Sequence, residues 1–350
     1  MSNKIKIGIS IGDINGIGLE VILKTLSHNS ILDYCTPIVY GHTKVASYHR
    51  KALGLTDFAF NVINDPSTAN IKKANLINCW EEDVKIDLGV SNETGGKYAL
   101  LSLQKATDAL IKGEIDALVT APINKHNIQS EAFNFPGHTD YLAKELEGES
   151  LMFMVSDTLR IGLLTDHVPL KDIVEHITSN LIEKKINTVY NSLIKDFNII
   201  RPKIAVLGIN PHTGDNGVIG HEDDTVMRPT LNKLKEAGKL VFGPYAADSF
   251  FGSNNYKNFD AIIASYHDQG LIPFKTLSFG QGVNYTAGLN KVRTSPDHGT
   301  AYEIAGKGIA DENSFKEAVF AAIKIFKNRL QYKELTSNPL KKGERKEYDH

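Results

Sequence analysis

Apolar runs of strand length alternate along the chain with longer stretches in which apolar residues recur every three or four positions. The first pattern is typical of buried β-strands and the second of amphipathic helices. Strands are predicted at residues 4–10, 36–41, 58–63, 115–121, 151–156, 159–164, 203–209 and 259–265. Helices are predicted at residues 19–26, 92–113, 177–197, 221–238 and 313–330. This alternation predicts an α/β fold with a mostly parallel sheet, and the two strands on either side of Asp157 predict a hairpin.

Composition narrows the class of protein. The 350 residues are 41% hydrophobic and 23% charged, the balance of an ordinary globular chain. The net charge is -2 and no basic stripe is present, so nucleic acid is not expected as a partner. Two cysteines, Cys35 and Cys79, allow neither a disulfide framework nor a CxxC zinc site. No run approaches a membrane span and the first residues lack a signal-peptide core, so we expect a cytoplasmic protein.

The stretch 266–311 concentrates residues that could carry chemistry. It follows the predicted strand 259–265, so His267 and Asp268 are expected where a strand ends and a loop begins. Open α/β sheets bind ligands at the carboxyl ends of their strands. Because loops seldom combine so many ionisable and amide side chains without a ligand to hold, we predict that this stretch lines a binding site.

Three predicted strands are each followed by a histidine: His167, His212 and His267. Parallel strands bring their carboxyl ends together, so the three imidazoles could meet at one sheet edge. Three histidines with an open position are the ligand set of a catalytic metal site, where the metal acts as a Lewis acid. The separations along the chain are long, and a single histidine after a strand is more often structural, so both interpretations stay open here.

A second set of residues suits a phosphate monoester, because cations combined with amide and hydroxyl donors match its oxygens. A plain helix cap and exposed salt bridges are the alternative interpretation. The helix after residue 138 is predicted to have its N-cap at Thr139 or Asp140. The members of the set are His138, Thr139, Lys275, Asn284 and Arg293.

Two aspartates are further candidates. Asp248 stands beside aromatic residues, and a buried carboxylate is uncommon unless it is paired, so it is the candidate catalytic base. Asp13 lies in a turn whose glycines, at positions 12, 16 and 18, do not match the GxGxxG dinucleotide fingerprint. It could point into a cleft or cap its own turn.

Seven stretches together resemble the 4-hydroxythreonine-4-phosphate dehydrogenase family of pyridoxal phosphate biosynthesis. They occur in order from residue 12 to beyond residue 300. Two of them depart from the family's pattern: Ile14 and Leu19 replace the prolines of GDPxGIGPE, and Thr213 and Asp215 change NPHAGE to NPHTGD. These changes affect loop rigidity more than chemistry. The stretches are GDINGIGLE, GHTDYLA, TDHVPL, NPHTGDNGVIGHEDD, YHDQGLIPFK, VNYTAGL and RTSPDHGTAYEIAGKG.

The resemblance implies a two-lobed α/β/α architecture similar to isocitrate and isopropylmalate dehydrogenases. One lobe would comprise 1–127 with about 290–350, and the other about 128–289. The family works as a homodimer whose active site lies at the subunit interface, with metal ligands from both chains. The resemblance makes His167, His212 and His267 the metal ligands, and His138, Thr139, Lys275, Asn284 and Arg293 the substrate contacts. The stretch DHGTAYEIAGKGIAD resembles a nucleotide-binding loop, which implicates His298, Gly299 and Gly306 in cofactor binding.

The reaction implied is the NAD-dependent and metal-dependent oxidation of 4-phosphooxy-L-threonine to 2-amino-3-oxo-4-phosphooxybutanoate. That product loses carbon dioxide to give 3-amino-2-oxopropyl phosphate. A related 4-phospho-threonate dehydrogenase is the alternative, and a metal-dependent lyase or acyl or phosphoryl transferase is a second one. The sequence does not separate NAD from NADP. Zinc suits three imidazoles, although magnesium, manganese or cobalt could serve.

Overall fold

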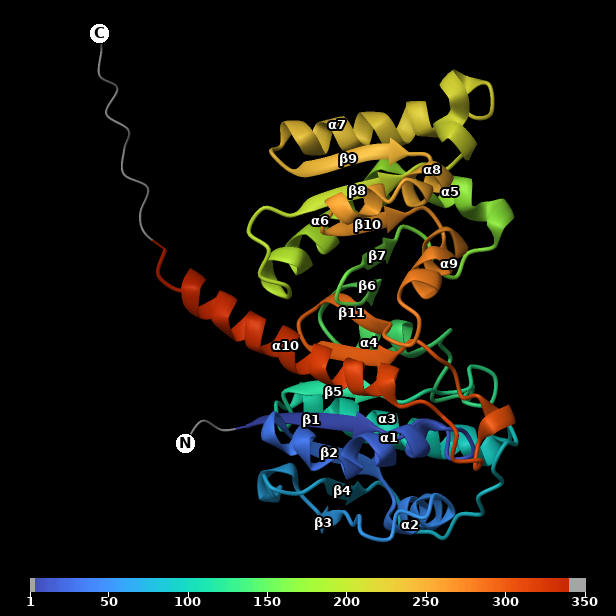
Figure 1. Cartoon of the computed structure of the whole chain (residues 1–350), viewed down its shortest axis with the longest axis vertical. Helices are drawn as coiled ribbons and strands as arrows, with labels where there is room; N and C mark the ends of the chain where they lie inside the picture. The colour runs from blue at the N-terminus through green and yellow to red at the C-terminus, as the bar shows by residue number, and fades with distance from the viewer. Residues whose placement is uncertain (1–3, 340–350) are drawn as a thin grey trace.

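The computed structural model describes residues 4–339. Its strands form one 12-stranded sheet in the order β3-β4-β2-β1-β5-β12-β11-β6-β7-β10-β8-β9. Figure 1 shows the strands stacked along the long axis of the molecule, with helices on both sides. The strands are β1 (Ile5–Ser10), β2 (Cys35–Gly41), β3 (Asn61–Ile63), β4 (Asn75–Asn78), β5 (Ala117–Thr120), β6 (Gly148–Val155), β7 (Arg160–Leu163), β8 (Lys203–Leu207), β9 (Leu240–Tyr245), β10 (Ala261–Ala264), β11 (Val283–Leu289) and β12 (Val292–Pro296).

The α-helices cover the strands in the alternation that the sequence predicts. They are α1 (Gly18–Ser27), α2 (Thr43–Ala52), α3 (Glu93–Ile111), α4 (His138–Glu145), α5 (Ile173–His176), α6 (Ser179–Lys195), α7 (Arg228–Glu236), α8 (Ala247–Gly252), α9 (His267–Leu277) and α10 (Asn313–Thr336). Within residues 4–339, no helix has the length and apolar character needed to cross a membrane.

The sheet is parallel in its two outer parts and antiparallel at its centre. The pairs from β3 to β12 are parallel, and so are those from β7 to β9. The antiparallel pairs are β12–β11, β11–β6 and β6–β7. The predicted α/β class and the hairpin around Asp157 are therefore confirmed. The two predicted lobes share this single sheet, and where the chain divides between them stays a prediction.

The stretch 266–311 differs most from its prediction. The loop expected at His267 is instead the start of α9, and two strands, β11 and β12, follow it. Pro273, a residue type that usually interrupts a helix, lies inside α9, and β11 is mostly buried by its neighbours. The predicted cap of α4 is also wrong, because this helix begins at His138 after Gly137.

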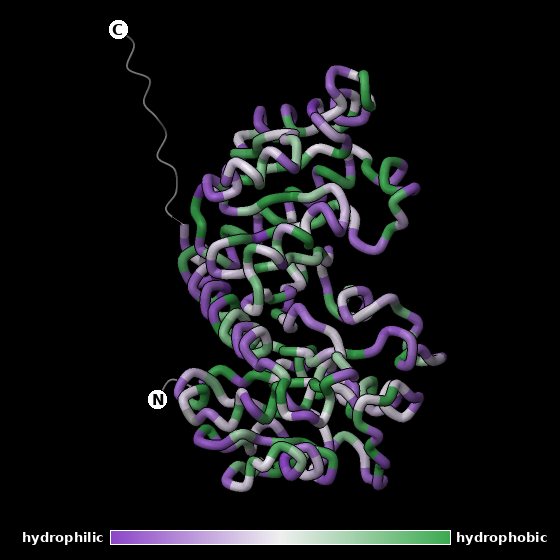
Figure 2. The backbone as a smooth tube through the Cα atoms, turned by 45° about the vertical axis from the view of Figure 1, so that its right-hand side comes forward, coloured by the Kyte–Doolittle hydropathy of each residue, from purple (hydrophilic) through white to green (hydrophobic). Residues whose placement is uncertain are grey.

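Central strands are buried on both faces because helices cover both sides of the sheet. Ile7 and Ile9 of β1 and Ile263 of β10 are completely buried, and they belong to one apolar cluster that extends from β2 to β9. In Figure 2, hydrophobic segments run through the interior, while α10 alternates polar and apolar positions along its length. Burial on both faces explains why these strands appear in the sequence as continuous apolar runs.

A buried ion pair joins α10 to α6. Arg329 Nε donates to Asp196 Oδ1 over 2.7 Å, and Tyr285 of β11 donates its hydroxyl to Asp196 Oδ2 over 2.6 Å. Ser192 also donates to Asp196 Oδ2, over 2.6 Å. The Asp196 side chain is only 2% exposed, so its charge depends on these partners. The cluster ties the C-terminal helix to the half of the sheet that begins at β11.

Substituting Asp196→Asn is expected to lower the free energy of unfolding by about 3–5 kcal/mol, because Arg329 would keep a buried charge without its partner. Tyr285→Phe removes the hydroxyl that donates to the same carboxylate and accepts from Arg329 Nη2, but it leaves the ion pair in place, so it is expected to cost only about 1–2 kcal/mol. Urea unfolding curves of the two variants and the wild type measure the loss in free energy of unfolding. Equal losses in both variants would show that the ion pair contributes nothing beyond an ordinary hydrogen bond.

Candidate active site

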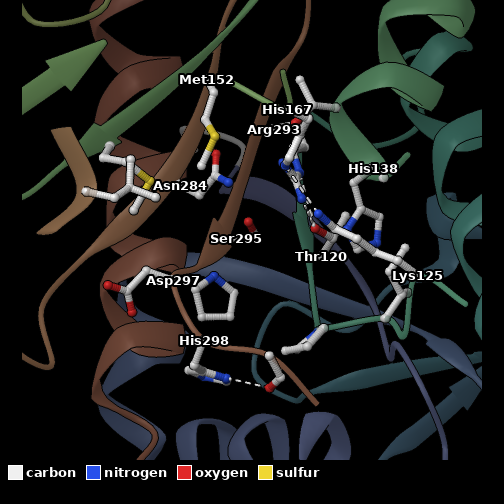
Figure 3. Close-up of a pocket in the computed structure, with 18 of the residues that line it drawn as sticks. Thr120, Lys125, His138, Met152, His167, Asn284, Arg293, Ser295, Asp297 and His298 are labelled. Atoms are coloured by element: carbon white, nitrogen blue, oxygen red, sulfur yellow. Dashed lines mark hydrogen bonds between the residues drawn. The ribbon is translucent and has the colours of Figure 1, made fainter. Parts of the chain in front are cut away.

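A cavity of about 280 Å³ opens where strands β5, β7, β10, β11 and β12 end or pass. Figure 3 shows its lining residues converging from these strands and from the loops after them. Nine of the predicted site residues line it: His138, Thr139, His167, His267, Lys275, Asn284, Arg293, His298 and Gly299. Residues far apart in the sequence are therefore brought to one place, as the strand-end argument predicted.

Arg293 supplies a buried positive charge to this cavity. The residue is 2% exposed, and its guanidinium donates to Thr120 from Nη2 over 2.6 Å and from Nε over 3.1 Å. Nη1 donates to the Thr286 hydroxyl over 3.1 Å. Burial lowers the pKa of Arg293. Since these partners are neutral hydroxyls, the charge is oriented but not neutralised, which is the condition for binding an anion.

Three polar atoms around the cavity are buried without a hydrogen-bond partner among the described residues: His138 Nε2, Asn284 Oδ1 and His298 Nε2. Buried polar groups are nearly always satisfied, so unsatisfied ones gathered in one cavity indicate a ligand. Burial, and then the charges of Arg293 and Lys125, hold the pKa of His138 well below its usual value. His138 is therefore a neutral imidazole that can donate one hydrogen bond and accept another.

His167 and His267 face each other across the cavity. They follow β7 and β10, which are parallel neighbours, and their ring centroids lie 6.1 Å apart. His267 Nδ1 is 2.7 Å from Asp268 Oδ1, the carboxylate–imidazole contact that orients metal-ligating histidines. Burial, and then Lys125, lower the pKa of His167, which keeps its ring neutral as a metal ligand must be. These two residues fit a divalent metal ion.

His212 does not join them. It is exposed on the 3-10 turn Pro211–Gly217, and it does not line the cavity. From His212 to Asn216 every φ is positive, so the turn leaves the end of β8 in a left-handed course that carries the imidazole outward. Residues 4–339 contain no cluster of three His, Cys, Asp or Glu that could hold a metal. Within the described residues of one chain, His212 therefore lies apart from His167 and His267, and its role as a metal ligand stays a prediction.

Asp248 is exposed, although it was predicted to be buried. It lies in the first turn of α8, a favourable place for a carboxylate, while Phe250 fills the buried side of that short helix. Asp248 lines a neighbouring groove with Asp268 and Ile272 instead of the cavity. The carboxylates that do line the cavity are Asp140 and Asp297.

The loop after β12 is hydrogen-bonded to the glycine-containing turn that follows β1. Tyr302 donates its hydroxyl to Asp13 Oδ2 over 2.7 Å, and the backbone N–H of Asn15 donates to Asp13 Oδ1 over 2.8 Å. Asp13 therefore caps its own turn and does not line the cavity, which settles the two interpretations in favour of the cap. Gly306 also lies away from the cavity, and its φ of 77° is in the region that favours glycine.

The chain is similar to known proteins over most of its length. Residues 33–322 match the model of the family described as "Pyridoxal phosphate biosynthetic protein PdxA". The chain belongs to the PdxA family. It is 49% identical over 342 residues to a 4-hydroxythreonine-4-phosphate dehydrogenase of Bacteroides thetaiotaomicron, with 97% of this chain and 94% of that one covered.

Two further relatives carry different enzyme names. A D-threonate 4-phosphate dehydrogenase of Cupriavidus necator is 38% identical, over 89% of this chain and 95% of its own. The crystal structure of a 4-hydroxythreonine-4-phosphate dehydrogenase from Klebsiella pneumoniae aligns with a TM-score of 0.78 at 32% identity, covering 93% of this chain and 98% of that one. Relatives that carry two different enzyme names are thus similar to this chain over nearly its whole length.

The proline replacements of this PdxA-family chain fall in its core. Ile14 and Leu19 are both almost completely buried, and the Ile14 carbonyl lies 2.8 Å from the buried His49 Nε2. Other cavity residues were not predicted, among them Lys125, which follows β5 in the same way that His167 follows β7. The rule applied to the histidines would have found Lys125 if it had been extended to lysine. Thr120, Met152 and Ser295 carry no such signal, because they lie within or beside ordinary strands.

Proposed function

We propose that this PdxA-family chain oxidises 4-phosphooxy-L-threonine in an NAD-dependent and divalent-metal-dependent reaction. The product, 2-amino-3-oxo-4-phosphooxybutanoate, is a β-keto acid that loses carbon dioxide to give 3-amino-2-oxopropyl phosphate. The observation that carries the proposal is the unneutralised, buried Arg293 in the same cavity as His167 and His267. An anion site and a metal-type imidazole pair within one small cavity suit a phosphorylated alcohol.

The phosphate would be held by Arg293, His138, Asn284, Thr139 and Lys275. Arg293 and Lys275 contribute charge, while His138, Asn284 and Thr139 contribute directed hydrogen bonds. Asn284 can donate to a phosphate oxygen through its amide nitrogen, and its unpartnered Oδ1 can accept from a substrate hydroxyl or amine. Holding the phosphate at a fixed distance from the imidazole pair positions the secondary hydroxyl beside that pair. Fixing the reacting groups in this way lowers the activation barrier, because their relative freedom has already been lost on binding.

His167 and His267 would hold the metal ion, for which zinc is the proposed identity because imidazole nitrogen suits it. When bound, the ion would supply Lewis acidity to the secondary hydroxyl. Asp268 keeps the His267 ring oriented through its 2.7 Å contact with Nδ1, so that Nε2 is left for the ligand. His298 and Gly299 line the cavity beside these groups and are the proposed contacts of the nicotinamide cofactor.

We also propose that the active form is a cytoplasmic homodimer whose site is completed across the subunit interface. His212 is exposed on a turn that leaves the body of its own chain, and α9 presents exposed apolar side chains at Ile272 and Leu277. Exposed apolar side chains close to a site favour a contact with another chain. Such a contact would allow two imidazoles from one subunit and one from the other to form the metal site.

Mixing two inactive variants tests the shared site. His212→Ala and His267→Ala are each expected to be inactive, and refolding them together is expected to restore about one quarter of wild-type activity, since half of the dimers of a two-fold assembly would carry one intact site. Mixing His167→Ala with His267→Ala is the matched control. It is expected to restore nothing if both residues serve the same site from one chain. No recovery in the first mixture would contradict the shared site.

The relative named D-threonate 4-phosphate dehydrogenase makes 4-phospho-D-threonate the second candidate substrate. The same anion site suits both compounds, which differ where one carries an amine and the other a hydroxyl. Parallel assays with NAD, zinc and each compound decide between them, and replacing NAD by NADP in the same assay decides the cofactor. We expect kcat/KM to favour 4-phosphooxy-L-threonine by at least about 100-fold. A site that hydrogen-bonds the amine of this substrate would keep a polar group without its partner when the hydroxyl compound binds. Turnover of 4-phospho-D-threonate alone would show that the enzyme is a threonate 4-phosphate dehydrogenase. If neither compound led to nicotinamide reduction, a lyase or transferase would be favoured.

A further inference from the structure

One cation of the cavity has no part in the reaction as described so far. Lys125 lies in the loop after β5 and lines the cavity, and its Nζ is 3.2 Å from His167 Nε2. Figure 3 shows its side chain reaching toward His167 from the side of the cavity that holds His138. An ammonium group can only donate, so His167 Nε2 must present its lone pair to Lys125.

The same lone pair is the one that a metal ion at His167 would need. His267 uses Nδ1 for Asp268, and His167 turns Nε2 toward the interior of the cavity, where Lys125 now meets it. Two cations cannot share one lone pair, and at this distance their charges repel. Lys125 and a metal ion at His167 would therefore compete for the same lone pair.

We propose that Lys125 is a substrate-binding residue that competes with a divalent ion for the lone pair of His167 Nε2, and that it binds the carboxylate of the substrate when the ion takes that lone pair. This inference rests on the proposed function, because it takes the substrate to be a phosphorylated hydroxy acid. It adds a contact for the second anionic group, which none of the phosphate-binding residues provides.

The arrangement of the cations supports the carboxylate as the partner. Lys275 lies at one side of the cavity, where Nζ donates to the Asp297 carbonyl over 3.3 Å. Lys125 lies next to His167, on the side of the cavity that also holds His138, and Figure 3 shows it well separated from Asp297. In 4-phosphooxy-L-threonine the carboxylate carbon is two bonds from the carbon that bears the secondary hydroxyl, so a cation beside the proposed metal ligand His167 is within reach of the carboxylate. The flexible stem of Lys125 lets the ammonium move over the short distance from Nε2 to that group.

Three variants test the proposal in full-length protein. Lys125→Met removes the charge and keeps the length of the side chain, and Lys125→Arg keeps the charge. Lys112→Met is the matched control, because Lys112 is exposed at the end of α3 and lies outside the cavity. Zinc affinity is measured by competition with a chromophoric chelator, and KM is measured for 4-phosphooxy-L-threonine and for NAD.

The two readouts should move in opposite directions. Lys125→Met is expected to bind zinc roughly 3- to 30-fold more tightly, because a repelling cation is gone. Its KM for 4-phosphooxy-L-threonine is expected to rise about 10- to 100-fold, the loss of a charged hydrogen bond, with KM for NAD unchanged. Lys125→Arg should retain wild-type zinc affinity and recover part of the KM. A merely structural role would weaken both affinities together.

Zinc binding to Lys125→Met that equals or falls below the wild-type affinity would overturn the proposal, and so would an unchanged KM for the phosphorylated substrate. Failure of the proposed function looks different, because wild-type protein would then reduce NAD with neither phosphorylated compound. The zinc competition needs no turnover and still decides whether Lys125 competes with the metal ion at His167. Calorimetric titration of 4-phosphooxy-L-threonine into zinc-loaded wild type and Lys125→Met decides the carboxylate contact without turnover.

Discussion

Replacing His267 with alanine is expected to lower kcat/KM at least about 1000-fold, because the metal ion proposed as Lewis acid would lose one of its proposed ligands. His267 begins α9 and is held by Asp268, so its imidazole is both placed and oriented before any ligand arrives. Preorganisation of this kind makes the remaining ligands poor substitutes. Steady-state kinetics at saturating NAD, together with zinc content after dialysis, measure the effect.

Two variants control this result. Asp268→Asn keeps the imidazole and weakens its orientation, so a loss of about 10- to 100-fold is expected, the usual cost of removing such a supporting partner. His28→Ala removes an exposed imidazole outside the cavity and should leave both rate and zinc content unchanged. If His267→Ala retained its zinc and more than a tenth of the wild-type kcat/KM, the metal role of His267 would be wrong.

Replacing Arg293 with methionine is expected to lower kcat/KM for the phosphorylated substrate by about 100- to 10,000-fold, because the phosphate would lose its buried cation and a set of charged hydrogen bonds. The same change is expected to leave the free energy of unfolding of the ligand-free protein unchanged or higher. Arg293 is buried against neutral hydroxyls alone, so an apolar side chain of similar length removes an uncompensated charge.

The combination of lost activity and retained stability identifies a residue kept for binding. Thermal unfolding of wild type and Arg293→Met without ligand measures the second part. Adding inorganic phosphate should raise the midpoint of the wild type and leave that of Arg293→Met unaffected, since only binding to the native state stabilises. A variant that unfolds much more easily than the wild type would instead make Arg293 a structural residue.

Much of this site could be predicted because parallel sheets obey a simple rule. Apolar runs mark the strands, and the polar residues that follow them must meet at the carboxyl edge. His167 and His267 were found in this way, and the structure brings them to 6.1 Å between ring centroids. The candidate phosphate-binding residues were predicted because cations and amide or hydroxyl donors suit phosphate oxygens. Of these, His138, Asn284 and Arg293 do line the cavity.

The misses have physical causes that local patterns do not contain. His212 follows a strand as the others do, but a run of positive φ values directs its turn outward, and such backbone geometry has no reliable signal in the sequence. Asp248 stands beside aromatic residues in sequence, yet a helical turn places neighbours on opposite faces, so Phe250 is buried and Asp248 is exposed. The start of α9 at His267 was hidden by Pro273 inside that helix.

The most direct test of the central claim is nicotinamide reduction by protein whose metal has been removed and then restored. Chelator-treated, repurified protein would be mixed with NAD and 4-phosphooxy-L-threonine, and the absorbance of reduced nicotinamide would be followed before and after zinc is added. We expect no reduction before zinc and rapid reduction after it. Undiminished reduction in the stripped protein, or none after zinc, magnesium, manganese and cobalt have each been supplied, would contradict the claim that this cavity oxidises a phosphorylated alcohol with the help of a metal.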